Sequence, residues 1–407
     1  MIRTRRPHAT IRPLLAAALT VILVACTGGA AGAPILAEPT IPGPSPALAT
    51  PAPPAVADPR PIVLPRDDGP HDRLTEWWYY TGHLRAVDGA RYGFEFVVFR
   101  AERGRFPTSW VSHLAITDET GQRFLYSQRL AVGTQVDRSP HDPDGRPTGF
   151  DLSLDGADPA RPATLGSPAW TMSGAGGHDR LAAALAPAEA ALAGAPTGLG
   201  LDLRLDTTRP AALHDRDGWI DFGPAGGSYY YSRTTMDAAG SLTVDGRAMT
   251  VEGTAWFDHQ WGDFISVGGG GWDWFAVDLA DGTDISLSLV RDTDGSYPLV
   301  YGTVVAPDGS VRHLDRDAFS VEVTDRWQSP ATGADYPAGW TVRIPGDDLT
   351  ISLRPTVADQ ELDTRATTGV VYWEGSQVVR ATRGGVPLGG EGYVELTGYA
   401  PSAAARD

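Results

Sequence analysis

Short runs in which apolar and polar residues alternate recur along this sequence and limit what the chain can fold into. The run YGFEFVVFR, at 92–100, places Phe94, Phe96 and Val98 on one face and Glu95 on the other. A period of two residues is the geometry of a β-strand. Asp-Gly pairs, which favour tight turns, occur between such runs at 88–89, 281–282, 294–295 and 308–309. This pattern predicts an all-β protein built from sandwiches or barrels rather than from βαβ units.

Two distant parts of the sequence also resemble each other. Both follow the order of an aromatic pair, an Asp-Gly turn and a run that ends in arginine: Trp78-Tyr79, Asp88-Gly89 and Arg100, then Trp274-Phe275, Asp281-Gly282 and Arg291. A length of 407 residues also fits two domains. We therefore predict two related β domains in tandem, the first at 66–263 and the second at 264–407.

The N-terminal region is typical of an export signal. An arginine-rich start leads into the apolar run LLAAALTVILVA, which is shorter than the ~20 residues that span a bilayer as a helix. The end of this run and the next residue, Leu23-Val24-Ala25-Cys26, resemble the lipobox of bacterial lipoproteins, although an ordinary secretion signal with an incidental cysteine is the alternative. We expect a signal peptide at 1–26, lipidation of Cys26, and an exported protein anchored on a periplasmic or extracellular membrane face.

The next segment, 27–65, is rich in Pro, Ala, Gly and Thr and nearly lacks aromatic residues. It cannot bury enough apolar surface to offset the entropy of ordering, so we predict a disordered tether. Since Cys26 is the only cysteine, the chain cannot form an internal disulfide, and packing alone must stabilise the fold.

Composition excludes several kinds of chemistry. All 33 basic residues are arginine, which excludes a Schiff-base lysine and a phosphate-binding lysine. A net charge of −17 would repel phosphate backbones, so we expect no nucleic-acid partner. The G-x-S-x-G, H-E-x-x-H and strand-linked G-x-G-x-x-G patterns are also absent from the sequence. We predict neither a metal site nor a cofactor.

Ionisable residues lie beside aromatic rings in a few segments: TEWWYYTGHL at 75–84, WFDHQWGDF at 256–264, VVYWEGSQV at 370–378 and GEGYVELTGY at 390–399. Alternation would place Trp256, Asp258 and Gln260 on one face of a strand and His259 on the other. A carboxylic acid buried among rings keeps its proton to a higher pH. Asp258 is therefore a candidate proton donor.

Each candidate also has a purely structural interpretation. Asp258 could cap a turn while a backbone carbonyl satisfies His259. Glu76 could be a carboxylate at a sheet edge beside core tryptophans, and Glu395 could belong to an exposed row. The sequence alone leaves these alternatives open.

These segments, together with GGSYYYSRT at 226–234, resemble the motifs of the hydroxyneurosporene synthase family. That family contains the acyclic carotenoid 1,2-hydratases and is grouped with secreted proteins often described as predicted hydrolases. The similarity runs from about His71 to Tyr399. It implies two tandem lipocalin-like (calycin) β-barrel domains, a hydrophobic ligand such as a polyene, isoprenoid or lipid, and no cofactor.

The resemblance also implies roles for particular residues. Asp258 would be the acid, His259 its orienting or water-activating partner, and Glu76 a further catalytic group. The expected ligand-binding residues are Trp77, Trp78, Tyr80, Tyr230, Trp256, Trp261, Tyr372, Trp373, Glu374 and Glu395.

Three functions are therefore open. The first is a carotenoid hydratase-like lyase that adds water across a double bond by acid–base catalysis. The second is a non-catalytic carrier that works with a membrane transporter. The third is a secreted hydrolase, for which the sequence offers no recognisable nucleophile.

Overall fold

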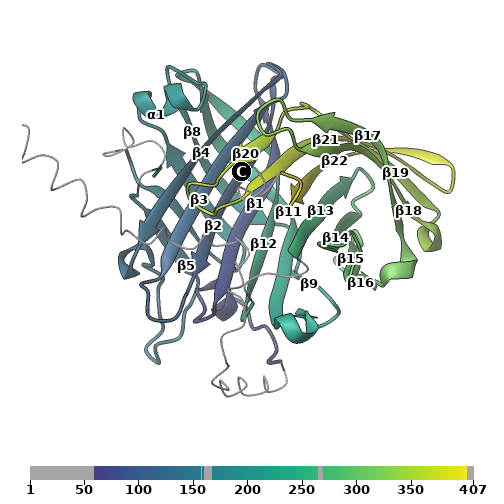
Figure 1. Ribbon diagram of the computed structural model, residues 1–407, viewed down its shortest axis with the longest axis horizontal. Helices are drawn as coiled ribbons and strands as arrows, with labels where there is room; N and C mark the ends of the chain where they lie inside the picture. The colour runs from purple at the N-terminus through teal and green to yellow at the C-terminus, as the bar shows by residue number, and fades with distance from the viewer. Residues whose placement is uncertain (1–58, 157, 160–166, 265–268, 401–407) are drawn as a thin grey trace, which may run out of the picture. The chain divides into compact units, whose positions relative to one another are not determined.

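The computed structural model describes residues 59–156, 158–159, 167–264 and 269–400, and nearly all of their regular structure is β-strand (Figure 1). The strands form two curled, nearly closed sheets, one coloured purple to teal and the other green to yellow in Figure 1. The predicted fold class, two tandem lipocalin-like barrels, is confirmed. The predicted signal peptide, Cys26 and most of the predicted tether lie outside the described residues.

The first barrel consists of antiparallel strands in the order β4-β3-β2-β1-β12-β11-β8-β7-β6-β5, with β9 and β10 paired to β11. Arg129 on β4 donates from Nη1 to the carbonyl of Leu154 on β5 at 3.4 Å, which links the two ends of the sheet. The strands are β1 (Thr75–Ala86), β2 (Arg91–Ala101), β3 (Ser109–Asp118), β4 (Arg123–Val132), β5 (Phe150–Leu154), β6 (Trp170–Ala175), β7 (His178–Ala184), β8 (Leu199–Thr207), β9 (Ala212–Leu213), β10 (Trp219–Asp221), β11 (Gly227–Val244) and β12 (Arg247–Gly262).

The second barrel has the order β16-β15-β14-β13-β22-β21-β19-β18-β17, with β20 paired to β21. Its strands are β13 (Gly269–Leu279), β14 (Asp284–Asp292), β15 (Leu299–Val305), β16 (Val311–Leu314), β17 (Ser320–Gln328), β18 (Asp335–Ile344), β19 (Leu349–Pro355), β20 (Glu361–Asp363), β21 (Val371–Arg383) and β22 (Val386–Thr397). Helices are short: η1 (Arg66–Asp68), η2 (Thr134–Val136), α1 (Pro187–Leu192), η4 (Gly223–Ala225), η5 (Arg316–Ala318) and η6 (Pro345–Asp347).

The Asp-Gly pairs form turns, as predicted. Gly89 lies between β1 and β2 with φ of 88°, and Gly282 lies between β13 and β14 with φ of 85°. Glycine adopts this left-handed conformation without the steric cost that other residues meet. The two equivalent hairpins agree with the repeat seen in the sequence.

Three strands of the first barrel, β1, β2 and β12, are buried on both faces. On one face, Trp78 and Phe257 belong to the core of the first barrel. On the other face, Tyr79 and Val97 pack with Trp274 of the second barrel. Because successive side chains of a strand point to opposite faces, each of these strands serves both the barrel core and the layer between the barrels.

Polar contacts also join the two barrels. Thr234 on β11 donates to Asp284 Oδ2 at 2.6 Å, and Arg209 Nη1 lies 2.8 Å from the same oxygen. His83 Nε2 lies 3.1 Å from the carbonyl oxygen of Gly392. Hydrogen bonds and an ion pair therefore stabilise the contact between the barrels, in addition to aromatic packing.

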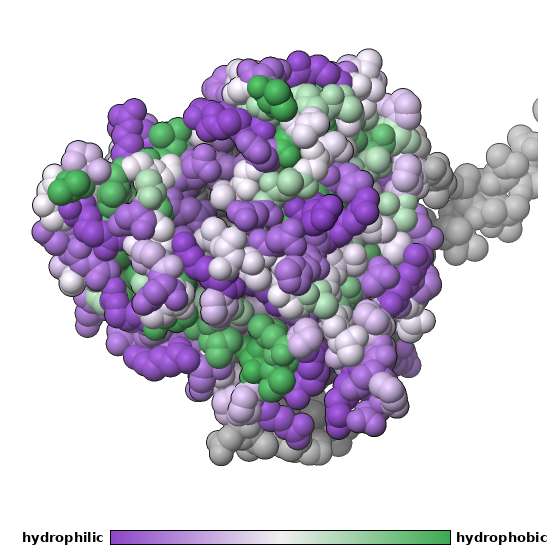
Figure 2. Space-filling view, turned by 180° about the vertical axis from the view of Figure 1, so that it is seen from behind, coloured by the Kyte–Doolittle hydropathy of each residue, from purple (hydrophilic) through white to green (hydrophobic). Residues whose placement is uncertain are grey.

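The face of the molecule in Figure 2 is covered largely by hydrophilic residues, and its apolar residues gather in small patches. Among the described residues, no helix has the length and apolar character needed to cross a membrane.

We predict that Glu189→Gln destabilises the first barrel strongly. Arg129 Nη2 and Glu189 Oε2 form an ion pair at 3.1 Å, and both side chains are 0% exposed. Removing the carboxylate leaves the guanidinium buried without its counter-charge, which costs about 3–5 kcal/mol. Urea unfolding measures this loss. Glu322→Gln, which breaks the exposed pair with Arg343, is the control and should cost under about 1 kcal/mol; equal losses in both variants would contradict the prediction.

Candidate active site

A cavity of about 120 Å³ lies between the two barrels, lined by residues from both. Its volume is close to that of an apolar cavity, of about 150 Å³, that is known to hold benzene. Ten of its sixteen lining residues are aromatic: Trp77, Tyr79, Phe99, Phe222, Tyr230, Phe264, Trp272, Trp274, Tyr301 and Tyr372. Among its polar residues are three carboxyl groups, those of Glu95, Asp258 and Glu395.

Asp258 lies on β12 and accepts hydrogen bonds from three side chains. Tyr230 donates to Oδ2 at 2.5 Å, Trp256 Nε1 donates to Oδ1 at 2.7 Å, and Ser232 also donates to Oδ1. Trp274 Nε1 in turn donates to the Tyr230 hydroxyl at 3.1 Å. These donors hold the carboxyl group in one orientation at the cavity wall.

Burial raises the pKa of Asp258 to about 6, although the hydrogen bonds from Ser232, Tyr230 and Trp256 oppose this shift. Desolvation penalises the charged form, whereas each donated hydrogen bond favours it. Asp258 is therefore mostly ionised at neutral pH and becomes protonated in mildly acidic solution.

Ser232 also contacts a buried histidine. His214 Nε2 lies 2.6 Å from Ser232 Oγ, and His214 Nδ1 lies 2.8 Å from Thr303 Oγ1. The serine thus lies between the histidine and Asp258. In a hydrolytic triad the histidine occupies the middle position and removes the serine proton, so this arrangement differs from a serine-hydrolase site.

A second group of carboxyls lies where β2 faces β21 and β22. Tyr372 donates to Glu95 Oε1 at 2.8 Å, and Tyr79 donates to Glu374 Oε1 at 2.7 Å. Glu374 and Glu395 are directly opposite each other on β21 and β22. Oε2 of Glu95 and Oε2 of Glu374 are buried and have no hydrogen-bond partner.

Burial is the main cause of the raised pKa values of these carboxyl groups. It raises the pKa of Glu95 to about 8 and the pKa of Glu395 to about 7. The pKa of Glu374 lies well above its ordinary range, because burial is reinforced by the nearby charges of Glu95 and Glu395. Glu95 therefore carries a proton at neutral pH, while Asp258 in the same cavity is mostly a carboxylate.

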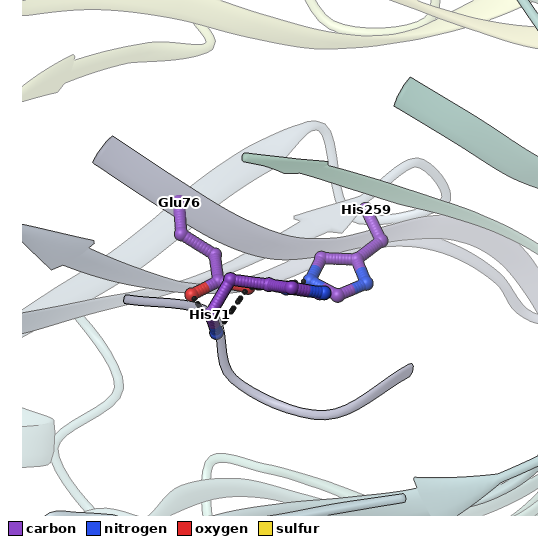
Figure 3. Close-up of side chains that lie close together, drawn as sticks. All are labelled: His71, Glu76 and His259. Atoms are coloured by element: carbon purple, nitrogen blue, oxygen red, sulfur yellow. Dashed lines mark hydrogen bonds and ion pairs between the residues drawn. The ribbon is translucent and has the colours of Figure 1, made fainter. Parts of the chain in front are cut away.

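His259 and Glu76 do not line the cavity, and together with His71 they form the cluster drawn in Figure 3. His259 Nε2 lies 3.0 Å from Glu76 Oε1, and His71 Nδ1 lies 2.7 Å from the same oxygen. The His259 ring stacks on Trp78, with centroids 4.7 Å apart. The expectation that His259 orients Asp258 is therefore corrected: neighbours in a strand point in opposite directions, and His259 faces the core of the first barrel.

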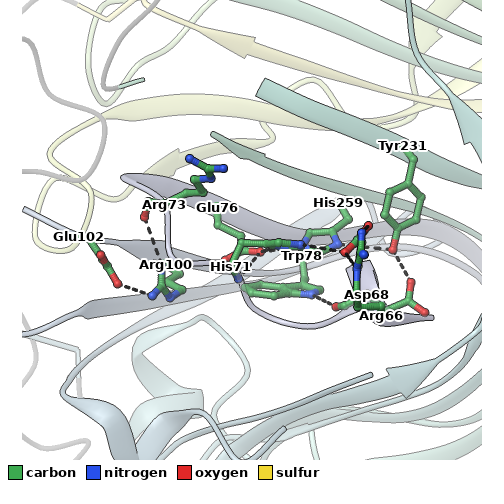
Figure 4. Close-up of polar contacts among 11 residues, drawn as sticks. Arg66, Asp68, His71, Arg73, Glu76, Trp78, Arg100, Glu102, Tyr231 and His259 are labelled. Atoms are coloured by element: carbon green, nitrogen blue, oxygen red, sulfur yellow. Dashed lines mark hydrogen bonds and ion pairs between the residues drawn. The ribbon is translucent and has the colours of Figure 1, made fainter. Parts of the chain in front are cut away.

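The segment before β1 is held to this core through buried charges (Figure 4). The carboxylate of Asp68 accepts hydrogen bonds from Tyr231 and from Arg233 Nη2, the latter at 2.7 Å. Trp78 Nε1 donates to the backbone carbonyl of Asp68 at 2.9 Å. Burial would raise the pKa of Glu76, but the charges and hydrogen bonds of His71 and His259 hold it below its ordinary value.

His71, Glu76 and His259 are the residues of the described chain whose ligand atoms lie close enough together to hold a metal ion, all within 4.8 Å. Two imidazoles and a carboxylate suit several divalent metals. Here the three side chains already satisfy one another through hydrogen bonds. A metal would have to replace those bonds in a site that is almost completely buried.

The structure distributes the predicted site residues over three places. Those that line the cavity are Trp77, Tyr230, Asp258, Tyr372 and Glu395. Trp256 and Glu374 bond to groups at the cavity wall. Those that face the core of the first barrel are Glu76, Trp78, Tyr80, His259 and Trp261. Trp373 belongs to the core of the second barrel.

Sequence reasoning missed Glu95 and Tyr79, although the signal was present. Tyr79 shares the strand face of Trp77, and Glu95 shares the face of Phe99, so the period of two connects each of them to the cavity. Trp274 was noticed only as part of the internal repeat. Which of the two faces would meet the second barrel could not be read from the period itself.

We predict that His71 stabilises the fold in a pH-dependent way. Burial alone would lower the pKa of His71, but the carboxylates of Glu76 and Asp67 raise it above its ordinary value of about 6.5. Its contribution is therefore complete below about pH 6.5 and is lost as pH rises through the raised pKa. The measurement is the difference in free energy of unfolding between the wild type and His71→Asn over a series of pH values.

We expect the difference in free energy of unfolding between the wild type and His71→Asn to shrink as pH rises. The same difference measured in a Glu76→Gln background should depend much less on pH. A difference that grows with pH would contradict the assignment of a protonated His71.

The comparisons with known proteins agree with this architecture. The sequence profile of the AttH-like family matches residues 55–399. A candidate AttH protein from Nitrosomonas europaea has a similar structure, with 28% identity, a TM-score of 0.69, and coverage of 85% of this chain and 99% of that chain. A comparison with curated protein sequences finds no match.

Two more distant structures share the fold alone. Kievitone hydratase from Nectria haematococca is 16% identical, with a TM-score of 0.60 and coverage of 84% of this chain and 94% of that chain. The structure of CghA with Sch210972 is 13% identical, with a TM-score of 0.50 and coverage of 80% and 89%. Since the family match spans most of the sequence, and the resemblance to carotenoid hydratase-like proteins is confirmed with it, the chain belongs to the AttH-like family.

Proposed function

We propose that this protein is a hydratase-like lyase that adds water across a double bond of an apolar unsaturated ligand, such as a polyene, an isoprenoid or another lipid. One observation carries the proposal: a single aromatic cavity contains two carboxyl groups in different surroundings, Asp258 with three hydrogen-bond donors and Glu95 with one. These surroundings favour the ionised form of Asp258 and the protonated form of Glu95, with pKa values of about 6 and about 8. Addition of water by acid–base catalysis needs one group of each kind. The fold similarity to kievitone hydratase, whose name describes a hydratase, is compatible with this reaction.

The reaction balances without a cofactor. Glu95 transfers its carboxyl proton to one carbon of the double bond, which leaves a carbocation at the other carbon. Water then bonds to that carbon through its oxygen, and Asp258 accepts the proton that the water loses. Proton transfer from Asp258 to Glu95 through solvent restores the enzyme. Aromatic faces around the cavity stabilise the cation by roughly 0.5–2 kcal/mol per favourable contact.

This mechanism gives the acid role to Glu95 rather than to Asp258. Asp258 accepts three hydrogen bonds that all favour its ionised form. Glu95 receives one hydrogen bond on Oε1, and its Oε2 has no partner. The proposed mechanism therefore assigns the carboxyl proton of Glu95 to Oε2, which has no other hydrogen-bond partner and would have to face the ligand double bond.

A non-catalytic carrier that delivers its ligand to a membrane transporter is the second candidate. The observation in its favour is that three protein donors already satisfy Asp258, as they would in a rigid wall. A secreted hydrolase is the weakest candidate. Ser232 donates its hydroxyl proton to Asp258, and His214 does not lie between the serine and the carboxylate as the histidine of a hydrolytic triad does. Hydrolysis of any member of a panel of simple esters would revive it.

We also propose that the protein is exported and anchored by a lipid on Cys26, on the periplasmic or extracellular face of a membrane. This rests on the lipobox-like sequence alone. A Cys26→Ala variant that still fractionates with membranes would contradict it.

We predict that Asp258→Asn abolishes hydration but retains the ligand. The amide keeps the size of the side chain but cannot accept the proton from water, and loss of a general base typically costs 10²–10⁴-fold in rate, as an order of magnitude. Mass spectrometry of the organic molecule that co-purifies from the native host should show a species lighter by one water in the variant.

Asp273→Asn is the matched control, because Asp273 lies on the opposite face of β13 from Trp272 and Trp274 and bonds to Tyr399. It should retain the same molecule as the wild type. If Asp258→Asn also retains that unchanged molecule, the protein is a carrier.

The pH dependence of activity should be bell-shaped. Activity requires Asp258 ionised and Glu95 protonated, so kcat/KM should fall below pH about 6 and above pH about 8. Once the substrate is identified, a rate profile over this range tests the assignment. A rate that rises continuously above pH 8 would exclude Glu95 as the acid.

A further inference from the structure

The ionisable side chains that line the cavity are all acidic. Its lining contains the carboxyl groups of Glu95, Asp258 and Glu395, and none of the sixteen lining residues is arginine or histidine. The nearby Glu374 adds a fourth carboxyl behind Tyr79. A negatively charged ligand would therefore meet the ionised carboxylate of Asp258 and no counter-charge, in a medium where charges interact more strongly than in water.

Asp258 supplies the negative charge at the wall of this cavity, because it is mostly ionised at neutral pH. No arginine or histidine lines the cavity to balance that charge. A ligand that carries positive charge would therefore be attracted to the cavity.

The aromatic walls suit the same kind of ligand. Trp274 packs edge to face with Tyr79 at 5.4 Å and 86°, and with Trp256 at 6.1 Å and 81°. Of these rings, Trp274 and Tyr79 line the cavity. A cation near a ring face is attracted by the negative charge density of the π-system, and such aromatic cages bind quaternary ammonium groups.

We propose that the cavity binds apolar organic cations, namely compact amines or quaternary ammonium groups carried on a hydrophobic molecule, and rejects carboxylates. The volume of about 120 Å³ limits the buried part to a group near the size of a benzene ring. The inference concerns the same cavity as the proposed function and narrows its substrate class, but it does not depend on turnover. It excludes free fatty acids, which a general lipid carrier would accept.

Three small probes of similar size test the proposal with the wild-type protein. They are benzyltrimethylammonium, its neutral carbon isostere neopentylbenzene, and phenylacetate, and their binding is measured by ligand-observed NMR and calorimetry. We expect the cation to bind roughly tenfold more tightly than the neutral isostere, and phenylacetate not to bind detectably. Equal binding of the first two probes, or tighter binding of phenylacetate, would overturn the proposal.

Variants then locate the site. Asp258→Asn keeps the shape of the side chain but removes the ionised carboxylate, and it should reduce the preference for the cation over the neutral isostere, whereas Asp273→Asn, outside the cavity, should leave that preference unchanged. If both variants retain the full preference, the cation binds elsewhere and the proposal fails.

The outcomes also separate this inference from hydration. If the cation is preferred but the wild type and Asp258→Asn hold the same co-purified ligand, the cation site is supported and the lyase is refuted. If the two ligands differ by one water but the probes show no preference for the cation, the lyase is supported and the cation site is refuted.

Discussion

The double burial of β1, β2 and β12 is the constraint on which the rest of this structure depends. Each strand must pack one set of side chains into the core of the first barrel and the alternate set against the second barrel. A polar residue on either face is then removed from water and must find a partner within the protein or keep an uncharged form. The wall therefore determines both how the two barrels pack and where ionisable groups acquire unusual properties.

Glu76 and Glu95 show how partners decide the effect of burial. Both carboxyl groups are fully buried, and burial acts on both in the same direction. Glu76 lies between two histidines, and their attraction outweighs desolvation, so its pKa falls. Glu95 has a single tyrosine donor and another carboxyl group nearby, so desolvation dominates and its pKa rises. The first belongs to a stabilising charge network and the second to the candidate reaction site.

Much of this arrangement was predictable from local pattern. The alternation that separates Trp77 and Tyr79 from Trp78, and Asp258 from His259, agrees with the faces seen in the structure. The error lay in accepting His259 as the partner of Asp258 on the basis of the family resemblance, although the alternation placed the two residues on opposite faces. Adjacent residues of a strand point apart by construction, so the nearest sequence neighbour is the least able to cooperate at one site. The partners of Asp258 instead come from the next strand, β11, at Tyr230 and Ser232, and from Trp256 two positions earlier.

The sequence by itself determined the β class, the two-domain repeat, the turns and the division of each strand into two faces, because all of these follow from short-range periodicity and turn chemistry. Only the tertiary structure decided which face became the cavity and which carboxyl groups changed their ionisation. Glu95 lies 277 positions from the tyrosine that bonds to it, and Tyr79 lies 295 positions from Glu374. Desolvation and hydrogen bonding depend on neighbours in space, and those neighbours exist only after the second barrel has packed against the first.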